Sequence, residues 1–251
     1  MHEEYFRLHP GADTAVLMIH GICGTPDHFR KMIGLQTLVP ENWSVCNLLL
    51  DGHGGTPADF AGTSGKKWKQ QIDAVYEKLA REHEEICIVG HSMGTLFALQ
   101  LAAAHPEKVK KLFLLAVPMR PRLKLSLIGD LLLMVFGKLD RAPEHRTALA
   151  RAAGIQTTWK LWEYIPWIPR FLDLFRIIYH TERIIPKVQA DCRCYQSRKD
   201  ELVWPCSEKV LAGNRNVQII LLEDSAHFYY APGDRDKILS DFVKWTEKSH
   251  G

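Results

Sequence analysis

A chain of 251 residues with 46% hydrophobic residues is long enough to bury a large core, and we expect a single α/β domain. Its net charge of +3 is too small to indicate a nucleic-acid partner, and no zinc-finger or stacked-aromatic pattern indicates one either. The first seven residues lack the basic and apolar regions of a signal peptide, and no apolar run reaches the roughly 18 residues that span a bilayer.

Apolar strand patterns alternate with helical patterns along most of the chain. This order predicts a mostly parallel sheet with helices on its faces. The predicted strands are residues 15–19, 43–50, 85–89, 109–117, 188–195 and 217–222. The predicted helices are residues 26–39, 64–83, 95–104 and 234–245, the first with Thr25 as N-cap and Pro26 in its first position.

The segment Gly90-His91-Ser92-Met93-Gly94 joins the third of these strands to a helix of small and apolar residues. The pattern G-x-S-x-G between a strand and a helix is typical of a nucleophile elbow, in which the serine hydroxyl leaves a strained turn. Side chains at the two flanking positions would collide with the neighbouring helix and strand, so both are expected to be glycine. The helix start also favours negative charge that develops beside Ser92.

Candidate partners for Ser92 follow it in the chain. Asp200 and His227 each come just after a predicted strand, so both are expected at the same sheet edge as the elbow. A serine hydroxyl needs a base within reach, and a carboxylate fixes the tautomer of that base. We therefore predict Ser92 as nucleophile, His227 as base and Asp200 as its carboxylate partner. Asp224, only three residues from His227, is the alternative acid.

The order Ser, Asp, His and several short motifs resemble the α/β-hydrolase superfamily, in particular its carboxylesterase and monoacylglycerol lipase branch. The matching motifs are the elbow, His20-Gly21, Asp51-Gly52-His53-Gly54 and Ser225-Ala226-His227. The resemblance covers about residues 12–245 apart from a variable middle segment. It implies an α/β-hydrolase core, residues 1–118 and 187–251, with a helical lid inserted at residues 119–186. Related epoxide and haloalkane hydrolases carry aspartate at the position of Ser92, which argues against those activities.

An oxyanion hole is expected from two backbone N–H groups. One belongs to Met93, directly after the nucleophile, and the other to Ile22, directly after His20-Gly21. A side-chain substitution at either residue removes no N–H group, so the two side chains are expected to line the acyl site instead.

The segment of residues 119–186 interrupts the strand-helix alternation with prolines and short helical patterns. Between residues 120 and 187 there are twelve Lys or Arg and six Asp or Glu, an excess of six positive charges. Trp159, Trp162 and Trp167 lie in this segment and are predicted to contact substrate. Three roles remain open for it: a cover over an acyl pocket, plain packing on the core, or transient contact with a lipid surface.

Six cysteines are present, several of them inside apolar strand patterns, and Cys192 and Cys194 are expected on one face of a strand. We interpret them as reduced, which together with the N-terminus predicts a cytoplasmic location. No Cys or His spacing indicates zinc, and no cofactor is expected.

The sequence thus predicts a hydrolase of short to medium acyl esters, with monoacylglycerols as candidate substrates and no obligate protein partner. A thioesterase, a C–C bond hydrolase or an acyltransferase could use the same triad, and a non-catalytic small-molecule binder could retain the pocket.

Overall fold

The computed structural model of the chain describes residues 2–136 and 144–247. Within these residues the centre is a seven-stranded sheet with the order β1-β3-β2-β4-β5-β6-β7. Strand β1 pairs antiparallel with β3, and the other pairs are parallel. The predicted mostly parallel α/β fold is confirmed. The strands are β1 (Tyr5–Arg7), β2 (Thr14–Ile19), β3 (Ser44–Asn47), β4 (Glu85–His91), β5 (Val109–Leu115), β6 (Asp191–Ser197) and β7 (Val217–Leu222).

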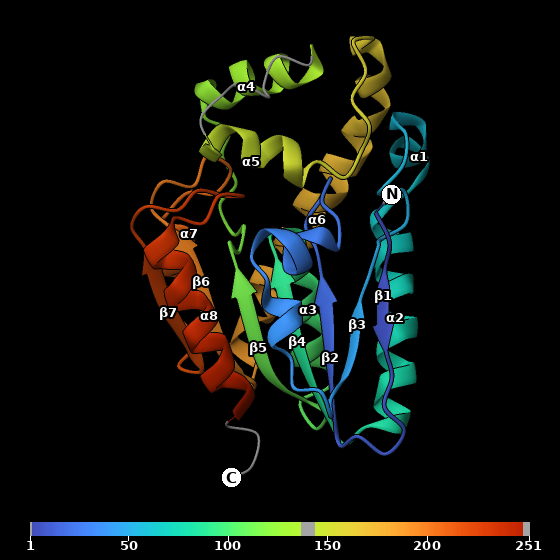
Figure 1. Cartoon of the computed structure of the whole chain (residues 1–251), viewed down its shortest axis with the longest axis vertical. Coiled ribbons are helices and arrows are strands. Elements are labelled where there is room, and N and C mark those ends of the chain that lie inside the picture. The colour runs from blue at the N-terminus through green and yellow to red at the C-terminus, as the bar shows by residue number, and fades with distance from the viewer. Residues whose placement is uncertain (1, 137–143, 248–251) are drawn as a thin grey trace.

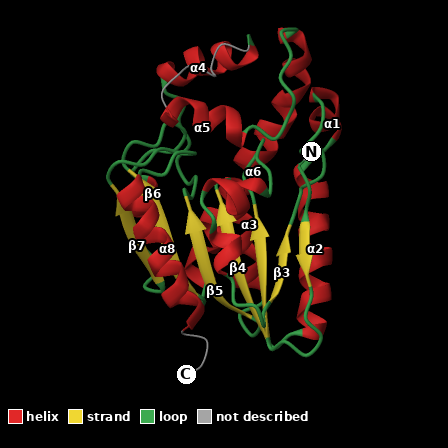
Figure 2. Ribbon diagram, viewed as in Figure 1, coloured by secondary structure: helices red, strands yellow, loops and turns green. Residues whose placement is uncertain are grey.

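Helices cover both faces of this sheet (Figure 2). Because side chains alternate along a strand, β2 sends Ala15 and Leu17 into one hydrophobic cluster and Val16 and Met18 into the other. The first cluster is closed by α2 (Gly65–Glu82), α3 (Met93–Ala104), α6 (Ile168–Ile184) and α7 (Ser207–Leu211). The second is closed by α8 (Pro232–Glu247) and by two short turns of helix after β2.

Helix α2 follows directly from its sequence pattern. The Ser64 hydroxyl caps its first turn by accepting a hydrogen bond from the Lys67 N–H at 3.2 Å, and Trp68, Ile72 and Leu79 are buried at helical spacing.

The prediction of one continuous helix over residues 26–39 is wrong. The structure has a π-helical turn η1 (His28–Met32) and a 3₁₀ turn η2 (Leu35–Leu38) instead. Gly34 between them has φ +91°, a conformation that ends the helix and that glycine adopts without strain. Thr25 acts through its carbonyl, which accepts from the His28 N–H at 3.1 Å, rather than as a side-chain cap.

Most of residues 119–186 lies beyond the carboxyl ends of the strands, at the top of Figure 1. This segment contains α4 (Leu125–Val135), α5 (Glu144–Ala152), the 3₁₀ helix η4 (Leu161–Trp167) and α6. Helix α6 descends onto the core, where Ile178 is buried and Gln100 of α3 donates a hydrogen bond to the Thr181 hydroxyl at 2.8 Å. The remaining elements are α1 (Pro57–Gly62) and η5 (Ile185–Lys187).

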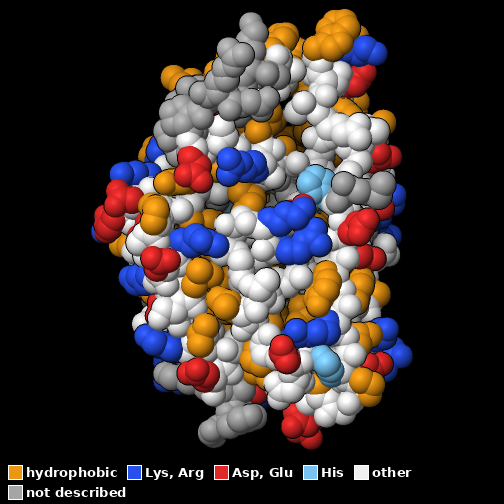
Figure 3. Space-filling model, viewed as in Figure 1, with side chains coloured by type: hydrophobic (Ala, Val, Ile, Leu, Met, Phe, Trp, Pro, Cys, Tyr) orange, Lys and Arg blue, Asp and Glu red, His pale blue; other side chains and the backbone are white. Residues whose placement is uncertain are grey.

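Large hydrophobic side chains are exposed where η4 and the first turns of α6 project from the molecule (Figure 3). They include Trp162, Ile165, Ile168 and Leu172. In the described part of the chain, no helix has both the length and the apolar character needed to cross a membrane.

All six cysteines are free. Cys192 and Cys194 are both buried in the first hydrophobic cluster, so the prediction that they share a face of one strand is confirmed.

Candidate active site

Ser92 lies between β4 and α3 in a backbone conformation of φ +49° and ψ −122°, which residues with a side chain rarely adopt. A Cβ atom at Gly94 would lie 1.9 Å from the Ile19 carbonyl oxygen of β2, and one at Gly90 would lie 2.8 Å from the Thr95 Cα and N of α3. The prediction that side chains at these two positions would collide with a strand and a helix is therefore confirmed. The tight crossing holds Ser92 at the first turn of α3.

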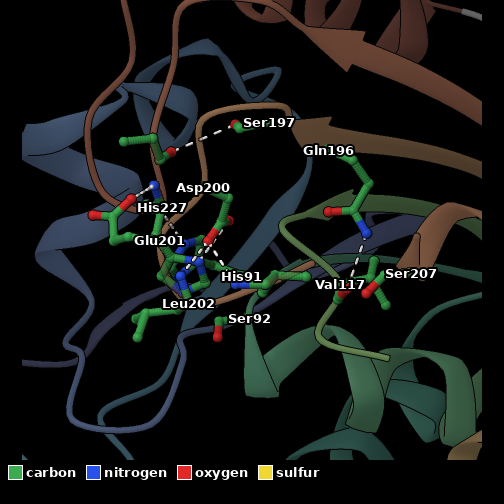
Figure 4. Close-up of polar contacts among 12 residues, drawn as sticks. His91, Ser92, Val117, Gln196, Ser197, Asp200, Glu201, Leu202, Ser207 and His227 are labelled. Atoms are coloured by element: carbon green, nitrogen blue, oxygen red, sulfur yellow. Dashed lines mark hydrogen bonds and ion pairs between the residues drawn. The ribbon is translucent and has the colours of Figure 1, made fainter. Parts of the chain in front are cut away.

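His227 and Asp200 form a buried pair, which Figure 4 shows in the same view as Ser92. The loop after β7 carries His227, and the loop after β6 carries Asp200, so both reach the edge of the sheet where β4 ends. His227 Nδ1 and Asp200 Oδ2 are 2.8 Å apart, and each side chain is at most 2% exposed. A carboxylate only accepts hydrogen bonds, so Nδ1 carries the proton and neutral His227 keeps a free lone pair on Nε2.

The pKa of His227 lies above its usual value of 6.5. Burial alone lowers the pKa because it disfavours the imidazolium, but the charge of Asp200 and the hydrogen bond to it outweigh burial. The pair therefore stabilises a positive charge on His227 when one forms.

Asp200 is held from two sides. Its Oδ1 accepts hydrogen bonds from the backbone N–H groups of Leu202 at 2.7 Å and Val203 at 2.8 Å. Arg122 donates to the Asp200 carbonyl oxygen through Nη2 and, at 3.1 Å, through Nε, and its guanidinium stacks on the Trp204 ring. These contacts aim Oδ2 at His227.

Asp224, the alternative acid, pairs instead with Lys199 at 2.7 Å, and its side chain is 69% exposed. Of the two candidate acids, only Asp200 contacts His227.

His91 contributes a contact that sequence reasoning missed. Its Nε2 donates a hydrogen bond to the backbone carbonyl of His227 at 3.1 Å, and its ring stacks on His28 with centroids 3.7 Å apart. His28 in turn is hydrogen-bonded to the Tyr230 hydroxyl at 2.9 Å. Burial lowers the pKa of both imidazoles, that of His28 to about 3, so this stack stays neutral. The sequence signal that could have indicated this contact is that His91 directly precedes Ser92 in the chain.

The Ser92 hydroxyl forms no hydrogen bond in the described part of the chain. The structure thus joins Asp200 to His227 directly, while Figure 4 draws the Ser92 side chain apart from the pair, with no bond to it. In unliganded enzymes such a contact often tightens only when substrate binds.

Ile22 follows Gly21, and Met93 follows Ser92, so the two predicted oxyanion-hole residues each adjoin a residue of this site. Gly21 lies against the elbow, since a Cβ placed on it would be 2.8 Å from Ser92 Cβ. Met93 begins α3, where the first N–H groups of a helix have no intrahelical acceptor. The N–H of Ile22 likewise has no acceptor among residues 2–136 and 144–247.

The loop of residues 20–27, which we call the β2–η1 loop, is fixed by histidines. His20 Nε2 accepts a hydrogen bond from the Leu50 N–H, and His53 Nε2 accepts one from the Cys23 N–H, both at 3.1 Å. Both imidazoles have pKa values lowered by burial. They serve as neutral acceptors that shape the loop.

The three tryptophans predicted to contact substrate lie in two environments. Trp159 and Trp162 are 64% and 59% exposed and pack edge to face with each other. Trp167 is partly buried, donates to the Pro57 carbonyl at 3.0 Å and packs on Phe60. Contact of these side chains with substrate stays a prediction.

Within the described ranges, no group of three or more His, Cys, Asp and Glu side chains is arranged to hold a metal ion. The clustered histidines are engaged with backbone groups and with one another instead.

A family model described as the alpha/beta hydrolase fold matches residues 14–156, more than half of the chain. The chain therefore belongs to the α/β-hydrolase fold family. The resemblance to its lipase and carboxylesterase branch is also confirmed by individual relatives.

Two relatives match nearly the whole chain. A thermostable monoacylglycerol lipase of Bacillus sp. (strain H-257) is 22% identical over 94% of this chain and 91% of its own length. A carboxylesterase of Bacillus subtilis (strain 168) is 24% identical over 95% of this chain and 94% of its own length. A solved structure from work on the metagenome-derived lipolytic enzymes LipS and LipT superposes with a TM-score of 0.72 at 22% identity, covering 98% of this chain and 97% of the other.

Proposed function

We propose that the protein is a serine hydrolase that cleaves carboxylic esters through an acyl-enzyme on Ser92. His227 acts as the base, Asp200 as its carboxylate partner, and the N–H groups of Ile22 and Met93 as the oxyanion hole. The observation that carries this proposal is the buried 2.8 Å contact between His227 and Asp200 beside a strained serine at a helix start.

The reaction takes two acyl-transfer steps. Ser92 Oγ attacks the ester carbonyl carbon while His227 Nε2 removes the hydroxyl proton. The two N–H groups stabilise the oxyanion, and the C–O bond breaks as His227 returns the proton to the leaving alcohol. A water molecule then attacks the acyl carbon while His227 Nε2 removes one of its protons. The bond between the acyl carbon and Ser92 Oγ breaks as His227 returns the proton to Oγ, and the acid is released. Asp200 stabilises the imidazolium in each step.

Esters of short to medium acyl chains, including monoacylglycerols, are the substrates we propose. The names of the monoacylglycerol lipase and carboxylesterase relatives support carboxylic esters and monoacylglycerols, and the acyl-chain length is part of the proposal alone. We also propose that residues 119–186 form a lid over the acyl site of a core made of residues 1–118 and 187–251. The position of α4 and α5 beyond the carboxyl ends of the strands supports a lid (Figure 1).

Replacement of the nucleophile tests the proposal. Ser92→Ala is expected to lower kcat on p-nitrophenyl esters by about 10⁴-fold or more, because the acyl-enzyme cannot form. Ser240→Ala, at an exposed position on α8, is the matched control and is expected to retain activity. A fluorophosphonate that labels the native protein is expected to leave Ser92→Ala unlabelled.

Retained turnover or labelling in Ser92→Ala contradicts the proposal. An acyl-chain-length series run beside acylglycerols and acyl thioesters then identifies the substrate class. A preference for thioesters contradicts the assignment to carboxylic esters while keeping the triad.

A further inference from the structure

A short stretch without regular secondary structure after α5 lies directly on two loops of the core. The Gly154 N–H donates a hydrogen bond to the Cys23 carbonyl of the β2–η1 loop at 2.7 Å. The Gly154 carbonyl accepts one from the Gly54 N–H at 2.5 Å, and the Gln156 N–H donates to the Gly55 carbonyl at 2.9 Å. Residues 154–156 therefore join the β2–η1 loop to the glycine-rich turn of residues 51–55.

Gly154 has no room for a side chain. A Cβ atom on it would lie 2.3 Å from the Gly24 carbonyl oxygen and 2.4 Å from Thr25 Cγ2. Contacts of a Cβ atom shorter than 3.0 Å are essentially never observed, so a methyl group at position 154 requires Gly154 and Gly24 to move apart by about 0.7 Å. The oxygen belongs to the backbone, so it can move only if the loop moves with it.

The peptide groups on either side of Cys23 are held by different partners. The N–H of Cys23 donates to His53 Nε2 at 3.1 Å, and its carbonyl accepts from Gly154. Cys23 has φ +56°, a costly conformation for a residue with a side chain, and it persists only where neighbours over-determine it. His53 and Gly154 supply these contacts. The residue they fix is the one that follows Ile22.

We propose that Gly154 is a positioning residue for the oxyanion hole. Through the Cys23 carbonyl and the van der Waals contact with Gly24, it sets the direction of the Ile22 N–H in the β2–η1 loop. The stretch of residues 154–156 is then part of the catalytic geometry itself. This inference rests on the proposed function, because it assumes that the Ile22 N–H stabilises the oxyanion of an acyl-transfer reaction.

Gly154→Ala tests the inference, with Gly129→Ala as the matched control. Gly129 lies in α4 of the same segment, and a Cβ there has nothing within 4 Å. Misplacement of a catalytic group by about 1 Å costs about 10²-fold, so kcat of Gly154→Ala on an ester is expected to fall about 10²-fold. KM is expected to change less than about threefold, because the carbonyl oxygen becomes an oxyanion only after Ser92 attacks and not in the bound substrate. A role limited to lining the pocket would raise KM instead.

Hydrogen exchange supplies a readout that does not depend on activity. Peptides that cover residues 20–27 are expected to exchange faster in Gly154→Ala than in the native protein, and at the native rate in Gly129→Ala. If Gly154→Ala does not fold, His53→Phe keeps an aromatic ring beside Phe60 and Trp68 but removes the acceptor for the Cys23 N–H. It is expected to show the same loss of kcat at nearly constant KM.

Folded variants with native kcat and native exchange over residues 20–27 overturn the inference while the native enzyme remains an esterase. A native protein without esterase activity overturns the proposed function instead. In that case the exchange measurement still decides whether Gly154 fixes the loop.

Discussion

The hydrogen bonds around the Asp200 carboxylate determine how an asparagine side chain at this position would be oriented. Oδ1 accepts from two backbone N–H groups at 2.7 and 2.8 Å, so the oxygen of the new amide must occupy that place. The amide NH₂ group then faces His227 Nδ1 and donates to it. The imidazole proton moves to Nε2, and Ser92 meets an N–H group where it needs a lone pair.

The expected loss in kcat for Asp200→Asn is about 10⁴-fold, the size known for a wrong tautomer in a serine triad, or about 5 kcal/mol of transition-state stabilisation. The pH profile changes as well. Asp200 holds the pKa of His227 above 6.5, and without the charge burial lowers it. The acid limb of kcat/KM, which requires neutral His227, is therefore expected to move to lower pH in Asp200→Asn.

The assay is the pH dependence of kcat/KM for p-nitrophenyl ester hydrolysis, with thermal unfolding to show that the variant is folded. Asp224→Asn is the matched control, because Asp224 is exposed and paired with Lys199. It is expected to keep native turnover and the native acid limb. Activity that survives in Asp200→Asn and is lost in Asp224→Asn would refute the assigned role of Asp200.

Two further predictions concern stability. The pKa of His28 is about 3 in the folded protein, whereas a histidine in the unfolded chain binds a proton near pH 6.5. The free energy of unfolding is therefore expected to fall as pH falls from 6.5 toward 3. The contribution of this group is at most about 1.4 kcal/mol per pH unit. His28→Phe is expected to flatten the curve of urea midpoint against pH in this range, and an equally steep curve would show that His28 is not responsible. Gly94→Ala places a Cβ 1.9 Å from the Ile19 carbonyl oxygen and is expected to lower the free energy of unfolding by about 1–3 kcal/mol or more. Gly233→Ala, with nothing within 4 Å of its Cβ, is the control in the same urea titration.

Local sequence was sufficient for the elbow and for the pairing of loops at one sheet edge. The strand before Ser92 is a continuous apolar run, and in a parallel sheet the carboxyl ends of strands meet at the same edge. Asp200 and His227 could be placed there because each follows such a strand. Helix α2 was predictable for the same reason, since its pattern and its Ser64 cap agree.

Other elements depend on contacts that a sequence pattern does not contain. Strand β1 is only three residues long and gains its form from pairing with β3. Most of the apolar residues of 26–39 are buried as a helical pattern predicts, but the positive φ of Gly34 interrupts the helix between them. Helix α1 did leave a signal that was overlooked, because Thr56 and Asp59 form a capping box with proline in the first position.

The contact between Gly154 and Cys23 had no signal at all. The two residues are far apart in the sequence, and a single glycine after a helix commonly marks only the end of that helix. Only the folded chain shows that its missing side chain leaves space for the Gly24 carbonyl.

With Ser92 as the proposed nucleophile, its backbone angles place catalysis and stability in competition at one residue. Glycine would relieve the left-handed conformation there at no steric penalty, yet it would remove the hydroxyl. Selection for thermal stability alone would therefore favour glycine at position 92, and the protein would lose the hydroxyl. Screening campaigns for a hardier catalyst must therefore impose turnover and temperature together.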